Sequence, residues 1–229
     1  MNRRTQLLPV AALLSVTLSL LLIFLYAPTD LNQGSIQRIL YVHAPSAMMM
    51  YLAVAVLAVA SILVLARRDD WARWDRIASA SAEVGVVFLT IVLVTGPIWG
   101  HKVWGAWWVW DARLTSTLVL WLILLGYLVF RALSPTGERR ARLSAVIGIV
   151  GSVDVPVIHF AVTWWRTLHP GPVAPLPGGD QLPGSMLLTL LVSFVAFTFL
   201  FAVLLTLRIR QAEAADRIDA IETLEPARV

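Results

Sequence analysis

Long apolar runs alternate with short polar connections along the whole chain. A helix that crosses a hydrocarbon core about 30 Å thick needs about 20 mostly apolar residues, because it rises about 1.5 Å per residue. Several runs reach this length. They predict six transmembrane helices, at approximately residues 6–26, 45–66, 77–98, 114–133, 143–163 and 186–207. The pattern therefore predicts an all-α integral membrane protein.

The composition also indicates that most of the chain lies in the hydrocarbon core of a membrane. Of the 229 residues, 59% are hydrophobic and 14% are charged, whereas soluble domains have about 45–50% apolar and about 25% charged residues. This excludes a soluble enzyme. The chain has no cysteine, which excludes disulfides, thiolate metal sites, iron–sulfur clusters and covalent haem attachment through Cys-x-x-Cys-His. Metal chemistry would have to use histidine, carboxylate or methionine.

The basic residues predict how the chain is oriented in the membrane. The formal net charge is +4, but the basic residues are scattered in short groups between apolar runs, so we expect no nucleic-acid partner. Counted on alternate sides of the six helices, 14 Lys and Arg fall on the side of the two termini and 4 on the other. The positive-inside rule then places both termini in the cytoplasm and three loops outside. The four outer basic residues are Arg38, Lys102, Arg113 and Arg166.

The chain is expected to form one polytopic membrane domain over residues 1–229, with residues 208–229 as a cytoplasmic tail. We find no internal repeat and no glycine-rich phosphate loop, so we expect no ATP hydrolysis by this chain. The first apolar run follows Arg3 and Arg4. It is long for a cleaved signal peptide and lacks a small-x-small site before Asp30, so we interpret it as the first helix.

Two histidines fall in the predicted outer loops. His43 directly precedes Ala44-Pro45, which places it at the mouth of the second helix because proline suits a first helical turn. His169 lies in the third outer loop, before a stretch rich in proline and glycine. Imidazole is a common axial ligand of haem iron, and two outer histidines could hold one metal from opposite faces. Spacing alone favours two unrelated surface histidines.

The second outer loop is unusually rich in tryptophan. Five of the ten tryptophans of the chain lie within residues 99–110. If residues 99–115 formed a short interfacial helix, Trp104, Trp107, Trp108 and Asp111 would share one face, with Trp110 directed elsewhere. Such an aromatic shelf could bind a planar apolar ring such as a porphyrin, or could anchor the loop at headgroup depth.

Three charged residues of these loops have more than one interpretation. Asp111 suits a helix end or a backbone contact better than a metal site. Arg38 and Arg113 could pair with a carboxylate such as a haem propionate, because a guanidinium binds carboxylates in a bidentate manner. Each could equally extend along the apolar surface with only its charged head in water.

Within the predicted helices, Glu83, Asp154 and His159 are the conspicuous polar residues. A charge at the bilayer centre costs about 2.5–3.5 kcal/mol on insertion scales, so such residues usually face the bundle interior. Asp154 lies beside Pro156, which predicts a loosened fifth helix. The three residues raise the alternative of a proton- or solute-coupled permease. A haem b electron-transfer subunit would need two deep histidines, and only His159 qualifies.

The tryptophan-rich segment also carries a family resemblance. Residues 99–115 read Trp-Gly-x-x-x-Trp-Gly-x-Trp-Trp-x-Trp-Asp-x-Arg-Leu-Thr, which resembles the signature of membrane proteins that handle haem in cytochrome c maturation. Arg-Ile-Leu-Tyr-Val-His-Ala-Pro around His43, and the segment from Val155 to His169, are similar to the haem exporter protein C family (CcmC). The resemblance covers nearly the whole chain and is weakest at the N-terminus, at residues 171–184 and in the tail.

The resemblance implies a site and a set of partners. It places two axial haem ligands on His43 and His169, a platform for haem b on the tryptophan segment, and the flanking arginines at Arg38 and Arg113. The implied platform comprises Trp104, Trp107, Trp108, Trp110 and Asp111. Members of the family present haem at the periplasmic face of the bacterial inner membrane to a periplasmic haem chaperone. The implied complex adds the membrane and ATPase subunits of an ABC transporter and a small single-span protein.

Overall fold

The computed structural model of the chain describes residues 3–165, 167–169 and 182–224, and its regular elements are helices. The elements are α1 (Arg3–Leu21), η1 (Leu22–Tyr26), η2 (Ser35–Ile39), α2 (Leu40–Ala66), η3 (Arg68–Asp70), α3 (Trp71–Trp104), α4 (Ala112–Leu133), α5 (Glu138–Ser152), α6 (Asp154–Trp164) and α7 (Gly184–Leu224). Six segments within these residues are long and apolar enough to cross a membrane. The all-α membrane fold predicted from the sequence is confirmed.

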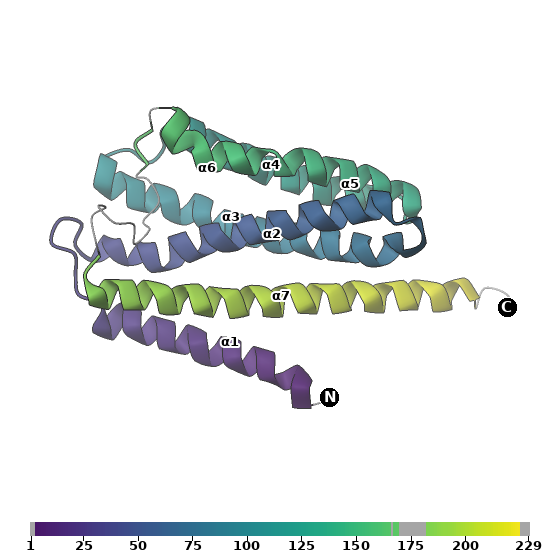
Figure 1. Cartoon of the computed structure of the whole chain (residues 1–229), viewed down its shortest axis with the longest axis horizontal. Helices are drawn as coiled ribbons and strands as arrows, with labels where there is room; N and C mark the ends of the chain where they lie inside the picture. The colour runs from purple at the N-terminus through teal and green to yellow at the C-terminus, as the bar shows by residue number, and fades with distance from the viewer. Residues whose placement is uncertain (1–2, 166, 170–181, 225–229) are drawn as a thin grey trace.

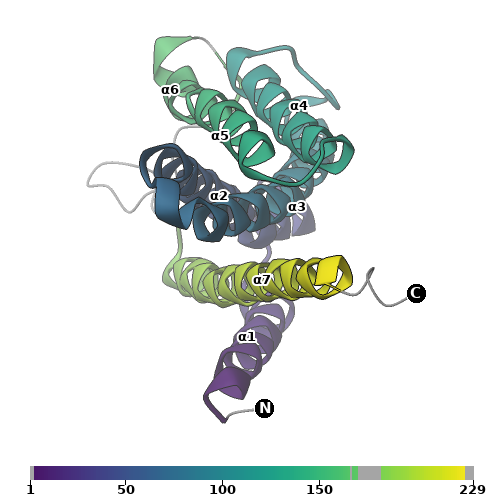
Figure 2. The same ribbon diagram turned by 90° about the vertical axis from the view of Figure 1, so that its right-hand side faces the viewer.

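The helices form layers around a central hairpin of α2 and α3. Figure 2 shows α4, α5 and α6 on one side of this hairpin, α7 on the other side and α1 beyond α7. The main core joins the hairpin to α4, α6 and α7, and its largest fully buried side chains include Met50, Leu57, Phe88, Leu120, Leu124, Tyr127 and Ile158. Glycine permits close contact between α5 and α2, because a Cβ atom at Gly148 would lie 2.8 Å from the Ser61 Oγ.

Helix α1 is the least buried part of the bundle. It packs mainly on α7, where the hydroxyls of Ser19 and Ser193 form a buried hydrogen bond of 2.9 Å. Leu7, Leu13 and Leu14 are each about two-thirds exposed. These side chains are suited to lipid, because among the described elements it is mainly α7 that packs on this helix.

Different connections between helices lie at the two ends of the bundle (Figure 1). The start of α1, the end of α7 and the connections after α2 and α4 lie at one end, here called the inner end. The connections that follow η1 and α3, the end of α6 and the start of α7 lie at the opposite, outer end. This separation is the one that the predicted topology requires, and the assignment of the inner end to the cytoplasm stays a prediction.

Some helix ends differ from those expected. We predicted that the second helix would begin near Pro45, but η2 leads directly into α2 at Leu40, so that His43 lies inside the helix. Burial of Leu40 and Tyr41 against Ile23 and Leu190 stabilises this extra turn and overrides the local preference of proline for a helix start. The third helix extends beyond both of its expected ends, over Trp71–Trp104.

The fifth span is interrupted at one residue, in agreement with the loosened helix that the sequence predicted. Helix α5 ends at Ser152 and α6 begins at Asp154, with Val153 between them. A Cβ atom at Gly151 would lie 2.7 Å from the Ile123 Cγ2, so the chain approaches α4 closely just before the break. In the expected tail, α7 continues as one helix to Leu224, and residues 225–229 lie outside the described part of the chain.

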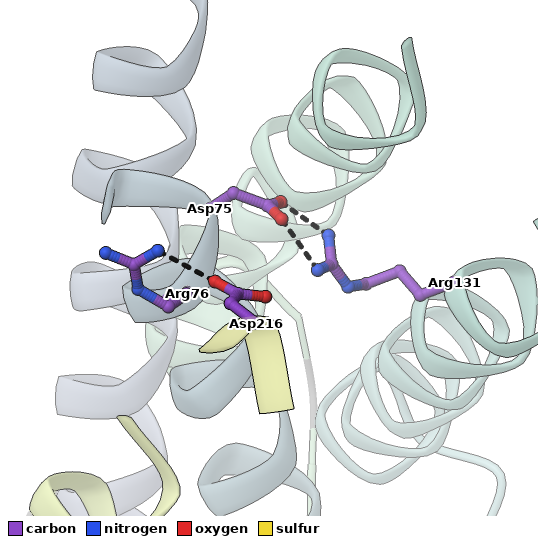
Figure 3. A network of polar contacts seen from close by, with 4 residues as sticks. All are labelled: Asp75, Arg76, Arg131 and Asp216. Carbon is purple, nitrogen blue, oxygen red and sulfur yellow. Dashed lines mark hydrogen bonds and ion pairs between the residues drawn. The ribbon is translucent and has the colours of Figure 1, made fainter. Parts of the chain in front are cut away.

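Ion pairs connect the helices towards the inner end. Asp75 of α3 and Arg131 of α4 form a bidentate pair with N–O distances of 2.5 and 2.8 Å, and their side chains are only 8% and 11% exposed (Figure 3). Arg76 pairs with Asp216 of α7 at 2.8 Å (Figure 3). Closer to the middle of α3, Glu83 pairs with Arg208. These pairs fix α4 and α7 against α3.

The buried pair should contribute strongly to stability. Replacing Asp75 by alanine leaves the Arg131 guanidinium buried without its partner, which costs about 3–5 kcal/mol in comparable proteins. We expect a loss of this size in the free energy of unfolding, measured in detergent with a denaturing surfactant. The control is Glu138→Ala, which breaks the exposed pair with Arg142 and should cost about 1 kcal/mol or less. Equal losses for both variants would contradict the importance of the buried pair.

Candidate functional site

His43 belongs to α2 and is held against α3 at the outer end. Its Nδ1 lies 2.9 Å from the Thr95 Oγ1. The Thr95 hydroxyl has one proton, which it donates to the Ile91 carbonyl at 2.6 Å, so towards His43 it acts as the acceptor. This network assigns the His43 proton to Nδ1. The Nε2 lone pair is then available for a metal, because the partner of one ring nitrogen sets the role of the other.

Small and aromatic residues of α3 define the space around His43. A Cβ atom at Gly96 would lie 3.3 Å from the His43 Cε1, so a larger residue there would displace the imidazole. The ring of Trp99 meets His43 edge-on at a centroid distance of 5.9 Å. The Trp99 indole N–H donates to the Gln33 side-chain oxygen at 2.8 Å, which ties the first outer connection to α3.

The structure brings the two predicted histidine ligands together. The ring centroids of His43 and His169 are 6.4 Å apart, with 31° between the ring planes. A metal–imidazole bond is about 2.0–2.1 Å long, so two such bonds on opposite faces of one metal, with the two ring radii, span about 6 Å. The separation therefore matches the pair of ligands that one iron atom would take. Trp104, the last residue of α3, meets His169 edge-on at 6.2 Å.

Asp111 and Thr167 form a polar connection between the second and third outer loops. Asp111 caps α4, and its Oδ1 accepts the Leu114 N–H at 2.8 Å. Its Oδ2 accepts the hydroxyl of Thr167. The Thr167 Oγ1 in turn accepts the His169 N–H at 3.1 Å. The interpretation of Asp111 as a helix-end acceptor is thus confirmed.

The expected single helix across the tryptophan segment is wrong. Helix α3 ends at Trp104 because Gly105 adopts a left-handed conformation, with φ of 73°, a conformation that glycine adopts readily at a helix end. Residues 105–111 form no helix, and α4 begins as a separate element at Ala112, with Asp111 as its N-cap. The tryptophans and Asp111 therefore do not share one helix face.

The tryptophans instead separate into two groups. Trp104 faces His169, while Trp107 is 60% exposed and stacks on His101 at a centroid distance of 4.2 Å. Trp108 and Trp110 lie on another side, where they line an open, apolar cavity of about 420 Å³ between α3 and α4. Pro97, Leu118 and Trp121 also line this cavity. Trp110 is 75% exposed, so this group presents aromatic surface outside the histidine pair.

The two candidate arginines lie in different surroundings. Arg113, in the first turn of α4, lies close enough to His43 and to the Tyr51 hydroxyl for its charge to act on both. Arg38 belongs to η2, and its guanidinium carbon lies 6.0 Å from the centre of the Phe24 ring in η1. Arg113 is therefore the arginine that the fold places beside the histidine pair.

The polar residues within the spans do not form one site with each other. Glu83 pairs with Arg208 of α7, whereas Asp154 and His159 belong to α6, on the opposite side of the central hairpin (Figure 2). His159 is exposed and packs edge-on against Tyr51 at 6.3 Å. This separation gives no support to a permease that uses the three residues together.

The histidine pair fits a metal that brings most of its own ligands. Among the described residues, no group of three or more His, Cys, Asp or Glu could hold a metal ion. Two imidazoles alone leave a metal incompletely coordinated, but a porphyrin supplies four nitrogens and needs only axial ligands. Trp99 and Trp104 add aromatic walls next to the two histidines. The site therefore suits haem better than a free metal ion.

Comparison with known proteins agrees with the geometry. The model of the family described as Heme exporter protein C (CcmC) matches residues 1–223. The chain belongs to the haem exporter protein C family. A Heme exporter protein C from Bradyrhizobium diazoefficiens is 37% identical over 221 residues, which cover 95% of this chain and 83% of the relative.

Two further relatives extend the comparison. The Heme exporter protein C of Escherichia coli K12 is 38% identical, over 72% of this chain and 66% of the relative. A putative cytochrome c biosynthesis ccmC-like mitochondrial protein of Arabidopsis thaliana is 40% identical, over 80% of this chain and 68% of the relative. Membership of this family supports a role in haem handling for cytochrome c maturation.

Sequence reasoning missed the residues that hold the ligands of the proposed site. Thr95 and Gly96 lie within an apolar helix, and only the fold brings them against His43, which is 52 positions away. Thr167 was one of several threonines near His169. Trp99 belongs to the tryptophan signature, but the sequence gives no indication of its bond to Gln33. The one available signal was the Thr95-Gly96-Pro97 sequence, which interrupts the apolar run.

The role assigned to Thr95 can be tested without any ligand. In Thr95→Val the His43 Nδ1–H loses its acceptor, a bond of about 0.5–1.5 kcal/mol, so both imidazole tautomers should be populated. Nitrogen-15 NMR of histidine-labelled protein should show a single Nδ1–H tautomer of His43 in the parent and a mixture in the variant. Thr198→Val is the control, because that hydroxyl bonds only within its own helix. An unchanged tautomer in Thr95→Val would refute the assignment.

Proposed function

We propose that this chain binds haem b at the outer end of the bundle and presents it to a periplasmic haem chaperone. His43 and His169 bind the iron from opposite faces, and tryptophans of the second outer connection contact the ring. The outer end is the periplasmic side of a bacterial inner membrane. The observation that carries this proposal is the 6.4 Å separation of the two imidazole rings.

The two histidines give this site a binding role. Two imidazoles and four porphyrin nitrogens fill the coordination sphere of iron, which leaves no open position for a substrate. We therefore propose that the chain is not an enzyme but a haem-binding and delivery subunit. Transfer then requires that an imidazole leaves the iron, because an incoming ligand such as a chaperone histidine needs its position.

Aromatic and charged groups beside the histidine pair support the binding of a porphyrin. Trp104 lies against His169, and Trp107 exposes aromatic surface on the same connection. Trp108 and Trp110 line the cavity between α3 and α4, so a role on the ring would require this connection to move. Arg113 is suited to bind a propionate, because its guanidinium lies near His43 and can form bidentate bonds with a carboxylate. Arg38 lies against Phe24, so a role on a propionate would require its side chain to move.

The proposed partners follow from the family. The names of the relatives refer to haem export and cytochrome c biosynthesis. We propose that this chain works with the membrane and ATPase subunits of an ABC transporter, a small single-span protein and the chaperone. ATP hydrolysis is assigned to a partner, since the sequence has no phosphate-binding loop. The largely exposed helix α1 contacts lipid in this arrangement.

The central experiment measures haem in purified full-length protein. The parent should show the absorption spectrum of low-spin, six-coordinate haem. His43→Ala and His169→Ala should each lose one axial ligand and give a high-spin component, and the double variant should lose most of its haem. Bound haem is quantified as its pyridine complex and divided by protein concentration.

Two other histidines serve as matched controls. His101 stacks on Trp107, and His159 packs against Tyr51 within the spans. His101→Ala and His159→Ala should retain the low-spin spectrum. Unchanged haem content and chaperone loading in the double variant of His43 and His169 would overturn the ligand assignment. Loss of haem in His159→Ala alone would instead favour a ligand inside the membrane.

A further inference from the structure

Asp111 belongs to the tryptophan-rich segment, but one of its two carboxylate oxygens accepts a hydrogen bond from Thr167 of the third outer loop. We propose that Asp111 and Thr167 are positioning residues: together they hold the backbone at His169 so that its imidazole lies opposite His43. This inference rests on the proposed function of the two histidines. It gives Asp111 a role that acts through the protein backbone.

The carboxylate of Asp111 is anchored on a rigid element. Its Oδ1 accepts the backbone N–H of Leu114, which fixes it at the N-terminus of α4, and the side chain is largely buried, with 9% of the residue exposed. Its Oδ2 accepts the hydroxyl of Thr167. Both oxygens are thus engaged by protein donors. A rigid helix end is thereby tied to a residue 56 positions later in the chain.

The hydroxyl of Thr167 links Asp111 to the backbone of His169 by acting as donor and acceptor at once. It donates its single proton to Asp111, and its oxygen accepts the His169 N–H at 3.1 Å. One atom therefore fixes the distance between the cap of α4 and the backbone of His169. A serine can make the same two bonds, whereas a valine of nearly the same shape can make neither.

The connection acts on His169 together with Trp104. Trp104 ends α3 and meets the His169 ring edge-on at 6.2 Å, and Asp111 caps α4. The two ends of the segment between these helices therefore hold His169: Trp104 contacts its ring, and Asp111 holds its backbone through Thr167. His43 is fixed independently through Thr95 of α3. Loss of the Asp111–Thr167 connection should disturb one imidazole and leave the other in place.

The first test needs no haem. Hydrogen–deuterium exchange of the full chain in lipid nanodiscs reports on the peptide that contains His169. In Thr167→Val its amide should exchange about 2- to 10-fold faster, the factor expected for the loss of one ordinary hydrogen bond. Thr167→Ser should exchange like the parent. Thr163→Val is the matched control, because the Thr163 hydroxyl bonds only to the Phe160 carbonyl of its own helix.

The second test uses ferric protoporphyrin IX as the probe. Thr167→Val should bind it about 10- to 100-fold more weakly than the parent, as is typical when a residue that orients a metal ligand is lost. Its spectrum should gain the same high-spin component that is expected for His169→Ala. Added imidazole should restore the low-spin spectrum in both variants. Thr167→Ser and Thr163→Val should match the parent.

The outcomes separate this inference from the proposed function. A low-spin parent with an unchanged Thr167→Val spectrum would overturn the inference alone, as would unchanged amide exchange in that variant. A parent that binds no ferric haem in the low-spin form would overturn the proposed function and, with it, the purpose assigned to this connection. Faster exchange together with a high-spin component that imidazole reverses would support both.

Discussion

The hydrocarbon core of the membrane determines where a binding site can form in this protein. Backbone N–H and C=O groups cannot be left unpaired in lipid, so the chain must be helical across the core. Irregular backbone then occurs where helices end. The connection from Gly105 to Asp111 lies at the outer end, and His169 lies there too, because its ring meets Trp104 at the end of α3. The histidine pair occurs where these helix ends meet.

The end of α3 and the start of α4 determine how the tryptophan-rich connection between them is arranged. Gly105 ends α3 with a positive φ, and Asp111 caps the start of α4 seven residues after Trp104. Because the segment between them is not helical, its tryptophans point in different directions: Trp104 towards His169, and Trp108 and Trp110 towards the cavity beside Pro97. A continuous helix would have placed most of them on one face and left Asp111 without the role of a cap.

The inner part of the bundle serves a different purpose. The buried Asp75–Arg131 pair and the Arg76–Asp216 pair join α3 to α4 and α7. Because α3 also carries Thr95 and Gly96 beside His43, and α4 carries Asp111 and Arg113, the relative position of these helices sets the spacing at the outer end. The haem site that we propose thus depends on contacts far from it in space.

The sequence by itself determined that most of the chain lies in lipid and which elements it forms. Its apolar runs predicted six membrane helices, Asp154 and Pro156 indicated a loosened fifth helix, and the tryptophan signature indicated the family. These features are local, so periodicity and composition reveal them. The tertiary structure alone decided that His43 and His169 face each other, that Arg113 rather than Arg38 lies beside them, and that Thr95 and Thr167 hold them. These contacts join residues far apart in the chain, and only the packing of whole helices brings such residues together.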